Sequence, residues 1–227
     1  MKKYLLNSIV LLIFGLTQSQ TRIDQNLKNE LNIILKSDQI LREYIDSETT
    51  ENRKVEILKE TGYSKEELFQ DNVFMILKKR DSINLVKVEK IIAEYGYPGK
   101  SLVGEPTNEA TWYVIQHSNE IPKYFPLIKE AANKSEIPFT LFAMMQDRLL
   151  TSEGKEQIYG TQGGWKKTTN KETGLAEYLR YISPIKDPES VNERRKKAGF
   201  TSTVEENAKR MEIVYKVYSL DEINNIK

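Results

Sequence analysis

The chain has a single histidine, His117, and this side chain is its best candidate for acid–base chemistry. An imidazole gains and loses a proton near neutral pH, so it can act as a general acid or base. A carboxylate that binds one ring nitrogen orients such an imidazole, as in catalytic triads. We therefore predict His117 and Asp147 as a catalytic pair, which requires hydrogen-bond reach between the two side chains. Alternatively, His117 ends a helix and interacts with the helix dipole.

Arginines and glutamines elsewhere in the chain could hold the ligand of such a site. The planar guanidinium of arginine binds two oxygens of a carboxylate or a phosphate at once. Arg42, Arg148 and Arg194 are therefore candidates for holding an anionic group. The residues that we predict to bind a small polar or anionic ligand are Gln39, Arg42, Gln116, Arg148, Gln157, Tyr159, Thr161, Gln162, Arg194 and Arg195.

The most unusual stretch of the chain runs from Gln157 to Gln162 and contains Tyr159, Gly160 and Thr161. In an extended conformation, alternate side chains of this stretch share one face. A glycine inside it lets a ligand or another backbone come close. This pattern predicts a strand whose polar side chains form the rim of a ligand site. The alternative is a turn whose side chains satisfy buried backbone groups, because buried polar groups are usually hydrogen-bonded.

Some charged residues have simpler explanations. Asp38 and Arg42 lie one helical turn apart, which is typical of a surface ion pair that contributes about 0.2–0.5 kcal/mol. Asp81 can cap a helix or continue one. The basic run at 194–197 has acidic neighbours, which favours a solvated helix face over a phosphate-binding patch.

Composition excludes several classes of function. Lys and Arg number 34 against 33 Asp and Glu, so bulk charge does not favour nucleic-acid binding. The absence of cysteine excludes disulfides and thiolate sites, and one histidine is too few for the usual catalytic zinc site. Gly99, Lys100 and Ser101 resemble the end of a phosphate-binding loop, but Glu94 stands where its first glycine is needed. We predict no metal and no cofactor.

The N-terminus has the pattern of a secretory signal peptide. Lys2 and Lys3 precede an apolar run over residues 5–16, and small residues follow up to Ser19. The run is short for a membrane span, which needs about 20 residues. We therefore expect cleavage after Ser19 and an exported protein, periplasmic or secreted, without a membrane span. The alternative is an uncleaved anchor.

Residues 20–227 are predicted to form a single, mainly α-helical domain with a small β-hairpin in its C-terminal third. Apolar residues recur at spacings of three and four along most of the chain, and glycines or capping residues separate these stretches. We expect helices at 22–46, 51–61, 64–77, 83–95, 107–117, 122–133 and 138–150, another beginning at 187–188, and a last one at 202–218. A strand is expected at 158–162 and a hairpin at 164–182.

Several short polar motifs, in a fixed order, resemble a bacterial family known only as domain of unknown function 6624. They are Asp38-Gln39-x-x-Arg42, Gly96-Tyr97-Pro98, Gln116-His117, Asp147-Arg148, Gln157-x-Tyr159-Gly160-Thr161-Gln162 and Arg194-Arg195. The resemblance covers roughly residues 36–200 and implies no particular activity. Motifs built from such polar residues resemble a ligand or active site more than a purely structural core.

Three functions compete at this point. The chain is an exported enzyme such as a hydrolase, a binding module without catalysis, or a structural protein whose polar motifs form a buried hydrogen-bond network. Convergence of the motif side chains on one pocket would favour the first two functions. The sequence predicts neither the substrate nor the oligomeric state.

Overall fold

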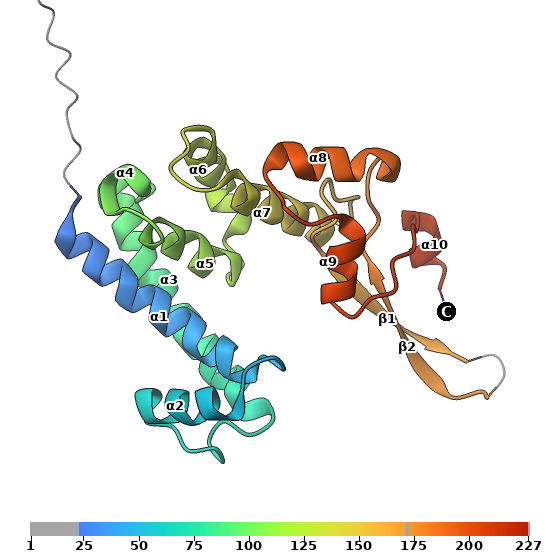
Figure 1. Cartoon of the computed structure of the whole chain (residues 1–227), viewed down its shortest axis with the longest axis horizontal. Coiled ribbons are helices and arrows are strands. Elements are labelled where there is room, and N and C mark those ends of the chain that lie inside the picture. The colour runs from blue at the N-terminus through green and yellow to red at the C-terminus, as the bar shows by residue number, and fades with distance from the viewer. Residues whose placement is uncertain (1–22, 171–172, 227) are drawn as a thin grey trace, which may run out of the picture.

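The computed structural model describes residues 23–170 and 173–226 (Figure 1). Within these ranges the chain is mainly α-helical, with one antiparallel two-stranded hairpin in its C-terminal third, as predicted. The predicted signal peptide, residues 1–19, lies outside the described residues. None of the described helices is long and apolar enough to cross a membrane.

The helices and strands follow one another along the chain with short connections. They are α1 (Gln25–Ile45), α2 (Glu51–Thr61), α3 (Asp71–Tyr95), α4 (Lys100–Val103), α5 (Ala110–Gln116), α6 (Ile121–Asn133), α7 (Phe139–Ser152), β1 (Gly163–Thr169), β2 (Ala176–Ile182), α8 (Val191–Ala198), α9 (Val204–Arg210) and α10 (Leu220–Asn224), with 3-10 turns at Thr107–Glu109 and Pro188–Ser190.

Three helices of the N-terminal half, α1, α3 and α5, pack against one another. The apolar stripe of α1, including Leu31 and Ile34, meets Val88 of α3 and Ile115 of α5 in the largest core cluster. Trp112 of α5 is buried in the same cluster, and its indole nitrogen donates to the backbone of Leu141, 2.9 Å away. This packing holds the middle of α1, the middle of α3 and the end of α5 close together.

The C-terminal part has a smaller core of its own, formed by residues such as Ile182, Val191 and Val204. The hairpin of β1 and β2 leads into it, and α8 and α9 pack against each other. Helix α7 packs on α6 and on α8, and so joins this part to the N-terminal helices (Figure 1). The loop between α7 and β1 therefore lies at the junction of the two parts.

Several element boundaries differ from those predicted. Asp81 caps nothing, because α3 runs through it as one helix to Gly96. The expected capping hydrogen bonds between Ser64 and Glu67 both form, but they close an isolated turn before α3 begins. The last predicted helix starts one residue later, at a capping box of Thr203 and Glu206. It ends at Arg210, well short of 218, and α10 follows as a separate turn of helix.

The expected strand at 158–162 does not form. A single bridge pairs Gln157 with Ile185, and the residues after it make an irregular loop in which Gly160 has a positive φ of 66°. Glycine adopts this conformation without strain, whereas the residues of a regular strand have negative φ. The hydrogen bonds of this loop go to side chains of neighbouring helices instead.

Candidate functional site

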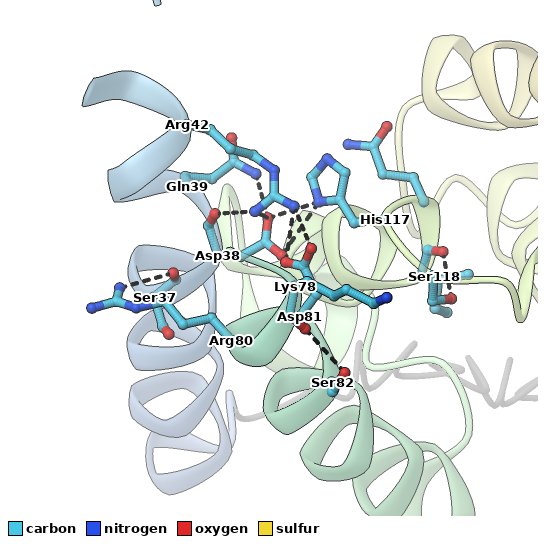
Figure 2. Close-up of polar contacts among 12 residues, drawn as sticks. Ser37, Asp38, Gln39, Arg42, Lys78, Arg80, Asp81, Ser82, His117 and Ser118 are labelled. Atoms are coloured by element: carbon cyan, nitrogen blue, oxygen red, sulfur yellow. Dashed lines mark hydrogen bonds and ion pairs between the residues drawn. The ribbon is translucent and has the colours of Figure 1, made fainter. Parts of the chain in front are cut away.

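Three helices bring ionisable side chains to one point. Asp38 comes from the middle of α1, Asp81 from the middle of α3, and His117 from the end of α5 (Figure 2). Arg42 reaches the same point from one turn further along α1. We call these four residues the His117 cluster.

Asp38 is completely buried, although it is an ionisable residue. It lies two turns after Leu31 and one turn after Ile34, which places it on the stripe of α1 that faces the core. Its carboxylate is 3.1 and 3.3 Å from Nδ1 of His117. The side-chain amide of Gln39 also donates to it, at 2.6 Å. An ionised carboxylate only accepts hydrogen bonds, so Nδ1 of His117 is the donor in this pair.

Arg42 joins the two carboxylates of the cluster. Its guanidinium donates to both oxygens of Asp81, at 2.8 and 2.9 Å, and to the backbone oxygen of Asp38, at 2.5 Å. Its distance to the carboxylate of Asp38 is longer, 3.6 Å. Arg42 is thus a bidentate partner of Asp81 and a weaker one of Asp38. The expectation that Asp38 and Arg42 form an ordinary surface pair is wrong, because Asp38 faces the core.

His117 keeps part of its ring accessible. Its side chain is 18% exposed, while that of its partner Asp38 is fully buried. In Figure 2 the ring nitrogen that does not bind Asp38 points away from both carboxylates. A ring that is anchored on one side and accessible on the other can transfer a proton or bind a ligand.

A hollow of about 410 Å³ opens beside the cluster, with Gln39 and Tyr113 in its wall. Gln39 connects it to the cluster through its bond to Asp38. Lys36 adds a positive charge to the wall and Glu109 adds a carboxyl group. Burial, together with the charge of Glu105, raises the pKa of the Glu109 carboxyl. The volume is within the usual range for small-molecule sites, about 300–1,000 Å³.

Asp147 has entirely different partners. Its carboxylate accepts hydrogen bonds from the backbone of Ile158 (2.7 Å), Tyr159 (3.0 Å) and Thr161 (3.0 Å), and from the hydroxyl of Thr161 (2.9 Å). The residue is fully buried in α7. Burial raises the pKa of the Asp147 carboxyl, and the four hydrogen bonds oppose this by stabilising the charged form. The predicted pairing of Asp147 with His117 is therefore replaced by the pairing of Asp38 with His117.

Most other polar groups of the 157–162 stretch also bind the protein itself. Gln157 is buried, donates to the backbone of Gln162 (2.9 Å) and Ser183 (2.7 Å), and accepts from the backbone of Gln162 (2.8 Å). Arg195 is only 2% exposed and donates to the backbone of Tyr159, at 2.8 Å. We call Asp147, Gln157, Arg195 and the loop they hold the Asp147 network.

The Asp147 network supports the alternative in which polar side chains satisfy buried backbone groups. Arg194 also belongs to it, since it donates to the backbone of Ile158 at 3.0 Å. The side chain of Gln162 binds the hydroxyl of Thr161, at 3.0 Å. Ligand binding by Gln157, Tyr159, Thr161, Gln162, Arg194 and Arg195 stays a prediction.

Arg148 connects the two regions. It follows Asp147 in α7, and its guanidinium donates to the backbone oxygen of Gln116, at 3.3 Å. Gln116 directly precedes His117. Burial lowers the pKa of the Arg148 guanidinium. Of the predicted site residues, the structure thus gathers Gln39, Arg42, Gln116, His117 and Arg148 around one region and places Asp147 in another.

Sequence reasoning missed Asp38 and Asp81 as members of the site. Asp38 had a signal, because a carboxylate on the apolar stripe of a helix needs a special partner. Asp81 had no such signal, because its position in the sequence is equally typical of a residue that caps a helix. Together with His117, these residues place three possible metal-binding atoms within 4.8 Å of one another. No such cluster was recognisable from residue spacing, and the prediction that no metal is bound stays untested.

The chain matches a family of unknown function, DUF6624, over residues 25–219. It belongs to this family. The match extends beyond the 36–200 range of the motifs and includes the start of α1 and the segment after α9. No curated protein and no solved structure matches the chain significantly. For this DUF6624 protein, functional arguments therefore depend on the geometry of the His117 cluster.

Proposed function

We propose that this DUF6624 protein is exported and binds a small polar or anionic ligand at the His117 cluster and the hollow beside it. We further propose hydrolysis as its reaction. The observation that carries this proposal is the buried Asp38 bound to the partly exposed His117. A protein interior tolerates a buried carboxylate when it is paired, and here the partner is the one side chain suited to proton transfer.

The surroundings of His117 support an anionic ligand. Arg42 belongs to the cluster, and Lys36 lines the hollow. Arg148 binds the backbone oxygen of Gln116, the residue before His117. Lys36 is paired with Glu60 at 2.8 Å, but an exposed pair of this kind contributes little and is easily exchanged for a ligand.

For hydrolysis, a group must take a proton from water while the substrate is held. His117 fits the first role, since Asp38 fixes the ring orientation in the way a triad carboxylate does. Arg42 and Arg148 fit the second role, because a guanidinium matches the geometry of phosphate and carboxylate oxygens. In this proposal Asp38 takes the orienting role that the sequence had suggested for Asp147.

A second function is supported for the other motif residues. The buried, internally hydrogen-bonded Asp147 network favours a structural role, in which the 157–162 loop joins α7 to α8 and α9. The two proposals concern different parts of the family pattern and do not exclude each other.

Ligand binding can be tested by NMR, because the only imidazole in the chain needs no assignment. Inorganic phosphate and acetate would be titrated into the mature protein while the His117 ring signals are followed. We expect a saturable shift for at least one of these anions. The Asp38→Asn variant should bind the anion with an affinity at least about tenfold lower, because the ring loses the acceptor that orients it.

The matched control for this experiment is Asp46→Asn, which removes a carboxylate at the exposed end of the same helix. This variant should bind like the wild type. Linear, unsaturable shifts, or equal binding by the Asp38 and Asp46 variants, would contradict the ligand site. Hydrolysis would be followed separately with p-nitrophenyl phosphate and p-nitrophenyl acetate, and activity unaffected by His117→Gln would rule out the proposed role of the ring.

Export needs its own experiment. The full chain would be produced in a bacterial host, and its intact mass would be measured in the periplasmic and medium fractions. We expect a chain that begins at Gln20. Full-length protein confined to the cytoplasmic fraction would contradict the proposal.

A further inference from the structure

Asp38, Asp81 and His117 offer three metal-binding atoms from three helices, within 4.8 Å of one another. Carboxylate oxygens and imidazole nitrogens bind divalent ions at about 2.0–2.6 Å. Two ligands of one ion are therefore at most about 4–5 Å apart, even when they lie on opposite sides of it. The spacing of these three groups is compatible with one shared ion.

The charges of the cluster leave room for a cation. Asp38 and Asp81 carry two negative charges, and Arg42 carries one positive charge. The cluster thus holds two carboxylates and one guanidinium, and Asp38 is fully buried. Buried charges in proteins are normally paired or coordinate metals. An ion at this point would add positive charge beside the two carboxylates.

The two carboxylates are also held in the manner of metal ligands. Gln39 donates to Asp38 at 2.6 Å, and Arg42 donates to both oxygens of Asp81. Ligating carboxylates usually have such outer hydrogen bonds, which fix their orientation. Each carboxylate oxygen has a second lone pair, so these bonds leave capacity for an ion.

We propose that Asp38, Asp81 and His117 bind a divalent transition-metal ion such as Mn²⁺ or Zn²⁺, with His117 coordinating through Nδ1. Two carboxylates and one imidazole suit these ions better than Ca²⁺, which prefers oxygen ligands alone. The ion takes the place of the Nδ1 hydrogen between His117 and Asp38, and the neutral ring then carries its one hydrogen on Nε2. Three protein ligands leave coordination positions for a ligand.

This inference deepens the proposed function. It rests on the proposed function only for the anion that would bind beside the metal ion. A bound cation would strengthen the attraction of the cluster for an anion. It would also make His117 a metal ligand, so that proton transfer by the ring would belong to the metal-free protein alone. Cation binding and anion binding can be measured independently, and either can fail without the other.

Metal binding can be tested by calorimetry on mature protein stripped with a chelator and dialysed. Mn²⁺, Zn²⁺, Mg²⁺ and Ca²⁺ would be titrated separately. We expect one Mn²⁺ or Zn²⁺ per chain, bound more tightly than Mg²⁺ and Ca²⁺. Mn²⁺ should also broaden the His117 ring signals before other side-chain signals.

Two variants and one control make this experiment decisive. Asp81→Asn and His117→Gln should each weaken binding more than about tenfold, a loss that even outer-shell changes can cause. Asp46→Asn should bind like the wild type. Thermal melting of each variant checks that it is folded, and Asp81 is the safer ligand to change because its side chain is 18% exposed.

Three outcomes would overturn the inference. They are binding with a stoichiometry other than one, equal affinity in Asp81→Asn and the wild type, and His117 ring signals unaffected by Mn²⁺. Phosphate binding to the metal-free protein alongside any of these results would leave the proposed function standing. One Mn²⁺ bound without any effect of phosphate or acetate would instead support the metal site and contradict the proposed ligand.

Discussion

Two buried aspartates, Asp38 and Asp147, have the same side chain, the same complete burial and opposite kinds of partner. Asp147 accepts four hydrogen bonds, all of them from neutral groups of one loop. Asp38 faces the imidazole of His117, the amide of Gln39 and, at 3.6 Å, the guanidinium of Arg42. A carboxylate whose hydrogen bonds all come from one loop stabilises the conformation of that loop. A carboxylate that faces an imidazole can instead take part in proton transfer or in ligand binding.

Motifs that look alike in sequence therefore have different roles in the structure. The Asp147 network orders the loop between α7 and β1 and ties it to α8 through Arg195. The His117 cluster connects three helices but leaves one side of a ring accessible. Substitutions in the first region should lower the free energy of unfolding. Substitutions in the second should change binding while the fold persists.

The largest expected effect is that of Asp147→Ala. The change leaves the loop backbone of residues 158–161 without its acceptor in a buried place, and each lost partner costs about 1–3 kcal/mol. We expect a loss of at least about 3 kcal/mol in the free energy of unfolding, measured by urea denaturation.

Asp147→Asn serves as the control for that variant, because it keeps one acceptor oxygen and should lose less stability. The His117 ring signals should be unchanged in both variants, since Asp38 and not Asp147 binds the ring. A loss below about 0.5 kcal/mol, the range of ordinary surface changes, would show that the loop does not depend on this carboxylate.

An intermediate effect is expected for Arg195→Gln. Arg195 is 2% exposed, donates to the backbone of Tyr159 and Ser202, and lies 4.6 Å over the ring of Phe200. Glutamine is shorter and cannot reach all of these acceptors. We expect the free energy of unfolding to fall by about 2–3 kcal/mol, with anion and Mn²⁺ binding at the His117 cluster unchanged. Weakened binding with unchanged stability would reverse the roles of the two regions.

Sequence reasoning found the helices because their signals are local. The spacing of apolar residues in α1 and the left-handed Gly62 after α2 depend only on neighbours along the chain. The strand predicted at 158–162 does not form, although its pattern is local too, because Asp147 and Arg195 take up the backbone groups that a neighbouring strand would need. Tertiary contacts thus decided the conformation of that segment.

The same contrast between local signals and tertiary contacts explains why only part of the candidate site was predicted. His117, Arg42 and Gln39 were recognisable from residue type, whereas the partner of His117 lies 79 positions away in sequence. Which of several carboxylates meets the ring depends on how α1 packs against α5, and spacing does not encode that. The buried position of Asp38 could have been found, because it interrupts a regular apolar stripe.

The smallest expected effect on stability is that of Arg42→Gln, the same substitution as at Arg195 but in the other region. The side chains of Arg42 and Asp81 are 21% and 18% exposed, so solvent replaces part of what their ion pair contributes. We expect the free energy of unfolding to change by less than about 1 kcal/mol.

Mn²⁺ affinity should nevertheless change, because Asp81 loses the partner that orients it and the cluster loses one positive charge. Parallel urea and calorimetric measurements on the two arginine variants then separate the regions. A loss of more than about 2 kcal/mol in Arg42→Gln would mean that the His117 cluster is a structural network as well.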